Sequence, residues 1–168
     1  MDVSDLLHDS LGRVREQMPD LVAGLSVDDL AWRPDPEANS IAWLVWHLTR
    51  IEDDHVAGVA GREQAWIAEG WAERFGLPFA PDEHGYGMSS DDVARVRAGA
   101  DLLAGYYEAV AARTAAYVAT VTPADLDRVV DDGWDPPVTL GVRLVSVVDE
   151  VNAHLGQAQY VRGLLQRR

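Results

Sequence analysis

Apolar residues recur every three or four positions in four long stretches of the chain, which is the pattern of amphipathic helices. The stretches cover about residues 7–25, 41–59, 90–121 and 139–165. Asn39 or Ser40 can cap the second helix, and Ser89 or Ser90 can cap the third, with two acidic residues in its first turn. We therefore predict four long helices.

Residues that break helices separate these stretches. Prolines and Asn39 interrupt residues 26–40, and Gly and Pro residues form a long loop over 76–87 after one short predicted helix at 63–73. Thr122-Pro123 predicts a further short helix, and a loop at 131–137 precedes the last long helix. No stretch alternates over strand length. The pattern predicts an all-α four-helix bundle in a single domain, 1–168, with a long connection between helices 2 and 3.

Composition narrows the classes of function. The chain has 14 basic and 28 acidic residues, a net charge of −14, and it contains no Cys. Nucleic acids and anionic membranes are therefore not expected partners, and thiol nucleophiles and disulfides are excluded. No secretory leader opens the chain and no apolar run is long enough for a bilayer, so the expected location is cytoplasmic. Tyr106, Tyr107 and Tyr117 give the third helix extra apolar surface that permits a homodimer.

Three polar residues lie where the helices are expected to be buried. His47 sits beside the apolar stripe of the second helix, and Glu150 and His154 are four residues apart on one face of the fourth. Two imidazoles and a carboxylate from facing helices can bind a metal with one open coordination position. The alternative is a Glu–His pair on a solvated helix edge, because so acidic a chain produces this spacing often by chance.

Four further residues are candidates for second-shell or substrate-binding roles. His55 lies two turns after His47, although a pairing with Asp53 or Asp54 would also explain it. Trp134 precedes the fourth helix and can line a pocket. Arg143 lies two turns before Glu150 and can meet an anionic group, and Gln157 lies one turn after His154 and can orient a ligand. His8 and His84 are expected on the surface and in an exposed loop.

Two sequence stretches resemble the DinB-like superfamily: residues 32–48, containing Trp32-Arg33-Pro34-Asp35-Pro36, and residues 150–157. The resemblance spans nearly the whole chain. It implies a four-helix bundle holding one divalent metal, often zinc or nickel, through His47, Glu150 and His154. Many members have His where this chain has Glu150, and an acid there resembles the mycothiol-dependent branch. The chain lacks the C-terminal domain of the maleylpyruvate isomerase of that branch, so it is more similar to small single-domain mycothiol S-transferases.

The resemblance implies an enzyme that activates mycothiol, a sugar-linked cysteine thiol, as a metal-bound thiolate for conjugation to electrophiles in detoxification. The expected metal is zinc, with nickel or iron as alternatives, and the expected partners are the small thiol and the electrophile. An isomerase-like reaction with the same thiol, or ligand binding without turnover, remains an alternative. Two His and one carboxylate also occur in non-haem Fe(II) oxygenases, but those folds are usually rich in β-structure.

Overall fold

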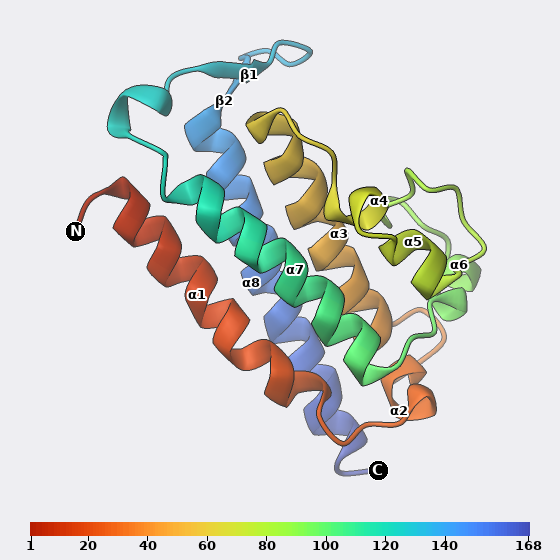
Figure 1. Ribbon diagram of the computed structural model, residues 1–168. Helices are drawn as coiled ribbons and strands as arrows, with labels where there is room; N and C mark the ends of the chain where they lie inside the picture. The colour runs from red at the N-terminus through yellow and green to blue at the C-terminus, as the bar shows by residue number, and fades with distance from the viewer.

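Four long helices form the body of the protein in the computed structural model, which describes residues 1–168 (Figure 1). They are α1 (Val3–Val22), α3 (Ile41–Ala60), α7 (Ala100–Val118) and α8 (Leu140–Leu165). The structure confirms the all-α four-helix bundle and the long connection between the second and third long helices. None of its helices is long and apolar enough to cross a membrane.

The long helices pack in a ring in which α3 contacts α7 and α8, and α1 contacts the same two helices from the other side. Helices α3 and α7 run in the same direction, whereas α8 runs antiparallel to α3 (Figure 1). The connection from residue 61 to residue 99 carries the chain back to the starting end of α3 before α7 begins. This arrangement places the second half of α8 beside the first half of α3.

Side-chain caps explain where the two site-bearing helices begin. The Ser40 hydroxyl accepts a hydrogen bond from the Trp43 amide at 3.1 Å. The Thr139 hydroxyl accepts one from the Val142 amide at 3.4 Å. Each satisfies an amide that has no partner inside the helix. Gly61, at φ 64°, ends α3 in the left-handed conformation that glycine adopts readily.

The structure divides two of the helices predicted from the pattern. The single short helix expected at 63–73 is two helices, α4 (Ala65–Ala68) and α5 (Trp71–Phe75), because Gly70 adopts φ 69° between them. The predicted third helix is divided into α6 (Ser90–Arg95) and α7, since the backbone is extended at Val96 and Gly99. Buried Val96 continues the apolar stripe across this break, which hides it in the sequence.

Three small elements were not expected. Helix α2 (Val27–Ala31) lies inside the region predicted to be broken, and a reciprocal cap between Ser26 and Asp29 stabilises it. Strands β1 (Val129–Asp131) and β2 (Val138–Thr139) form an antiparallel ribbon that leads into α8 and is too short for visible alternation. The short helix predicted at Thr122-Pro123 is the 3₁₀ helix η1 (Pro123–Asp125).

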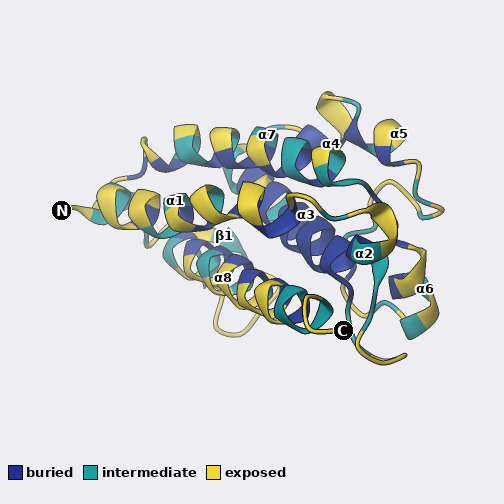
Figure 2. Cartoon of the chain, turned by 90° about the horizontal axis from the view of Figure 1, so that it is seen from below, coloured by how far each residue is buried: buried dark blue, intermediate teal, exposed yellow.

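Helix α3 is the most enclosed element, and α8 keeps one face exposed (Figure 2). The core is one cluster of apolar side chains drawn from all four long helices. Tyr106 and Tyr107 of α7 belong to that core, at 0% and 1% exposure, so they do not form the exposed face on which a dimer was considered. Most polar residues on α3 are buried as well, among them His47, Arg50 and Glu52.

Candidate metal centre

His47 of α3 meets Glu150 and His154 of α8 at the edge between the two helices. Glu150 Oε1 lies 3.0 Å from His47 Nε2 and 2.9 Å from His154 Nε2. One donor atom from each of the three residues lies within 4.8 Å of the others, which is the spacing of ligands around one ion. The structure thus brings together the three residues that the sequence identified as candidate metal ligands.

The hydrogen bond on the far side of His47 fixes its tautomer. His47 Nδ1 lies 2.5 Å from the backbone oxygen of His84, which can only accept, so Nδ1 must carry the proton. In a neutral ring Nε2 then presents a lone pair, and the nearest atom is the oxygen of Glu150. Two lone pairs repel unless a positive charge lies between them, either a proton on Nε2 or a metal cation. The donor set therefore fits a divalent cation.

His154 is held in a matching way. Its Nδ1 lies 2.7 Å from Oε1 of Gln157, one turn further along α8. The outer nitrogen of each imidazole is thus occupied by an oxygen, and both Nε2 atoms turn toward Glu150. Outer hydrogen bonds of this kind orient metal-binding histidines and raise their basicity.

The two histidines shape the electrostatics of the carboxylate. Hydrogen bonds with His154 and His47 hold the pKa of Glu150 well below its usual range, although partial burial opposes them. Burial lowers the pKa of His154, but the contacts with Glu150 and Gln157 outweigh it and leave that pKa raised. Glu150 is consequently an anion, as a metal ligand must be.

A buried arginine holds the loop that contacts His47. Arg50 is fully buried, and it donates hydrogen bonds to the Glu83 backbone oxygen at 3.1 Å and to Gln64 Oε1 at 2.6 Å. The Glu83 carboxylate then accepts the amides of His84 and Gly85 at 2.9 and 2.8 Å. This turn aims the His84 carbonyl at the imidazole. Arg50 was not among the residues predicted from the sequence, although a charged residue three positions after His47 in an apolar helix is itself a signal.

Gly85 makes the close approach of that loop possible. A Cβ at this position would lie 2.6 Å from His47 Nδ1 and 3.1 Å from a ring atom of Trp46, and the backbone φ is 100°. A larger residue would clash with the imidazole and would also be strained. On its other side the His47 ring stacks on Trp43, with ring centroids 4.5 Å apart. The imidazole is therefore fixed from both faces and along its edge.

Comparisons with known proteins give the family of the chain. The family model for mycothiol-S-transferase matches residues 6–167, nearly the whole chain. The chain belongs to the mycothiol-S-transferase family. The resemblance to this branch of the DinB-like superfamily is thereby confirmed. Among solved structures, the crystal structure of a conserved protein from Enterococcus faecalis is similar, with a TM-score of 0.92 and 31% sequence identity over 100% of this chain and 99% of that one. No curated protein matches.

In this member of the mycothiol-S-transferase family the other predicted site residues divide into two groups. Gln157 contacts His154, one of the three residues of the candidate metal site. His55 and Arg143 instead contact each other, and His55 also pairs with Asp54 at 3.3 Å, the alternative considered from the sequence. Trp134 lies in the connection between β1 and β2 with 67% of its surface exposed. The structure therefore places His55 and Arg143 in a second cluster along the same pair of helices.

Proposed function

We propose that the protein is a metal-dependent thiol S-transferase that conjugates mycothiol to electrophiles, a reaction suited to detoxification. The observation that supports this most directly is the convergence of His47 and His154 on Glu150, with the outer nitrogen of each ring already satisfied. The family match adds the class of thiol. For the metal we propose zinc, with nickel or iron as alternatives.

His47, Glu150 and His154 would hold the cation. When bound, a divalent metal stabilises the thiolate form of a coordinated sulfur and so supplies a nucleophile at neutral pH. Three ligands leave room for that sulfur, and a single carboxylate leaves the site with net positive charge that suits an anion. Because the chain has no Cys, the reacting thiol must come from the cosubstrate. Conjugation forms a carbon–sulfur bond and breaks the S–H bond of the thiol; the electrophile either opens a double bond and takes up the proton or releases a leaving group with it.

The protein's own groups position and shield this chemistry. The Glu150 and His154 side chains are 30% and 16% exposed, against 7% for His47, so the cluster opens toward solvent on its α8 side. Trp43 and the Gly85 turn cover the His47 side and exclude water there. A cosubstrate would therefore approach along α8, which rigidly holds two of the three ligands.

The test is a conjugation assay with metal-loaded protein, mycothiol and a fluorogenic thiol-reactive electrophile. We expect turnover that a chelator abolishes, that restored metal recovers, and that glutathione does not support. His154→Ala should lose metal and turnover together, whereas exposed His8→Ala should keep both. Turnover that survives complete metal removal would refute the assignment. Stoichiometric metal without turnover on any thiol would favour the alternative of a ligand-binding protein.

A further inference from the structure

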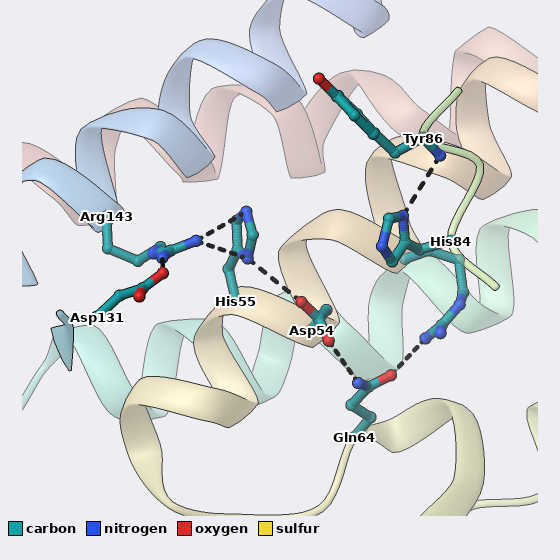
Figure 3. A network of polar contacts seen from close by, with 8 residues as sticks. Asp54, His55, Gln64, His84, Tyr86, Asp131 and Arg143 are labelled. Carbon is teal, nitrogen blue, oxygen red and sulfur yellow. Dashed lines mark hydrogen bonds and ion pairs between the residues drawn. The ribbon is translucent and has the colours of Figure 1, made fainter. Parts of the chain in front are cut away.

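A second polar cluster lies further along the same edge between α3 and α8. Arg143 Nη2 pairs with Asp131 Oδ2 at 2.9 Å, and its Nη1 lies 3.3 and 3.4 Å from the two ring nitrogens of His55. The guanidinium therefore lies against the imidazole ring, which also contacts Asp54 (Figure 3). These four side chains line an open cavity of about 340 Å³, and Val59 and Val130 give it apolar walls.

The cavity lies in line with the metal cluster. Arg143 lies seven positions before Glu150 on α8, and His55 lies eight positions after His47 on α3. At about 1.5 Å of rise per residue, both helices place the cavity about 10–12 Å from the metal cluster. Because the helices are antiparallel, the two distances run in the same direction along one edge (Figure 1). A single elongated small molecule can therefore occupy both places.

The side chains of the cavity suit hydroxyl groups more than charged ones. Two carboxylates accept hydrogen bonds and one guanidinium donates them, so a hydroxyl can both donate and accept here. The two carboxylates and one guanidinium sum to one net negative charge, which disfavours a carboxylate or phosphate ligand. Their side chains are only 19–39% exposed, so the cluster is partly desolvated and its hydrogen bonds are correspondingly stronger.

Two exposed aromatic residues belong to the segments that carry this edge. Tyr86, 83% exposed, projects from the loop that contacts His47, on the same side of α3 as His55 and Arg143 (Figure 3). Trp134, 67% exposed, lies three residues after Asp131 in the connection between the strands. Large aromatic side chains left in solvent near a polar pocket provide apolar faces on which a ring can pack.

We propose that this cavity binds the hydroxyl-rich sugar rings of the thiol cosubstrate while its sulfur reaches the cluster of His47, Glu150 and His154. The inference rests on the proposed function, and it identifies His55, Asp131 and Arg143 as residues that determine which thiol is used. A cysteine thiol linked to a sugar matches the separation of the two clusters, and the hydroxyl groups of a sugar match the polarity of the cavity. Glutathione carries carboxylates instead, which the negative cavity repels.

The test compares mycothiol with N-acetylcysteine, which carries the thiol but no sugar, in wild type, His55→Ala and the isosteric Asp131→Asn. Loss of one hydrogen bond to a charged group should raise the KM for mycothiol about tenfold while kcat is retained. The KM for N-acetylcysteine should not change. His8→Ala, exposed on α1, is the matched control and should leave both values unaltered. An equal rise for both thiols, or no rise for either, would overturn the proposal.

Calorimetric titration of mycothiol separates this proposal from the proposed function. If wild type binds mycothiol about tenfold more tightly than both variants but does not turn it over, the cavity assignment holds and the transferase assignment fails. If wild type turns over both thiols with similar KM, the transferase assignment holds and the cavity assignment fails. Wild type that does not bind mycothiol at all overturns the cavity assignment directly.

Discussion

Two glutamates lie within the same bundle in opposite electrostatic states. Glu150 faces two imidazoles at the edge of α8, and their hydrogen bonds hold its pKa well below the usual range. Glu52 lies on α3, is 1% exposed, and has one carboxylate oxygen without any hydrogen-bond partner. Burial raises the pKa of Glu52 to about 7, the Asp53 charge adds to this, and the Thr114 hydroxyl opposes it.

The difference shows that burial alone does not make a functional carboxylate. Glu150 has two nitrogen partners that favour its charged form, and a cation can replace the protons between them. Glu52 faces the apolar side chains of α1 and α7 around a cavity of about 30 Å³, with His8 and Arg15 at its lining. Glu52 is not part of a group of three or more side chains that could hold a metal ion. One site can hold a charge and the other is most stable when neutral.

The strongest test of this contrast is Glu150→Gln. Gln in place of Glu150 removes the anion that lies between the Nε2 atoms of the two histidines. We therefore expect loss of bound metal and a fall in the conjugation rate of about 100-fold or more. This effect is larger than that expected when a metal ligand loses only its outer hydrogen bond. Metal content by elemental analysis and the conjugation rate measure this. Asp149→Asn, which removes an exposed charge one residue away, should be neutral. Full metal occupancy in Glu150→Gln would contradict the site.

Glu52→Gln tests the other carboxylate through stability. Because its folded-state pKa is about 7 against an ordinary 4.5, the unfolded state ionises first and wild type loses stability as pH rises through this window. Ionisation of Glu52 lowers the free energy of unfolding of wild type by about 3 kcal/mol. This decrease is complete above about pH 7 and absent below about pH 4.5. Glu52→Gln should lack it, so the variant gains stability over wild type as pH rises.

Urea unfolding across that pH window measures the effect, and the difference between variant and wild type removes the contributions of other groups. The exposed Glu16→Gln should leave the pH dependence of wild type unchanged. Parallel stability curves for wild type and Glu52→Gln would show that the buried carboxyl titrates normally.

Gly85→Ala tests what holds the His47 imidazole in place. The new methyl group would lie 2.6 Å from His47 Nδ1 at φ 100°, so the loop must shift and the hydrogen bond from His47 to His84 must weaken. We expect a stability loss of about 1–3 kcal/mol together with weaker metal binding. Gly87→Ala has a φ of 73° but no neighbour within 4 Å. Gly87→Ala should lower the thermal unfolding temperature through backbone strain but keep the metal affinity of wild type. Equal metal affinity in both variants would argue against a role of the loop in orienting His47.

Much of the fold could be predicted from the sequence, because the spacing of apolar residues and the capping residues indicate the same helix boundaries. Ser40 and Thr139 stand where α3 and α8 begin, and both helices appear at the predicted places. The break between α6 and α7 was not predictable from the period, since Val93, Val96 and Leu103 continue one stripe across it. There the chain leaves the helix while its side chains remain in the core.

The candidate site was predictable only where helical geometry determines it. The four-residue spacing puts Glu150 and His154 on one face, and the apolar neighbours of His47 place it at an interface. The backbone oxygen that orients His47 comes from His84, 37 residues away in the sequence. No local pattern encodes that contact, because it depends on the burial of Arg50 beneath the loop.

The mildest test concerns Gln157, whose side chain holds His154 from outside the cluster at 2.7 Å. Gln157→Ala keeps all three metal ligands but frees the imidazole to rotate, so we expect metal affinity to fall about tenfold, with the fold unchanged. Competition with a metal-binding dye measures the affinity. Gln159→Ala, which removes only a contact with Gln17 on the helix surface, is the matched control. Equal metal affinity in the two variants would mean that Glu150 alone orients His154. The difference between Glu150 and Glu52 would then come from the imidazoles that contact Glu150, and the hydrogen bond between His154 and Gln157 would contribute little to it.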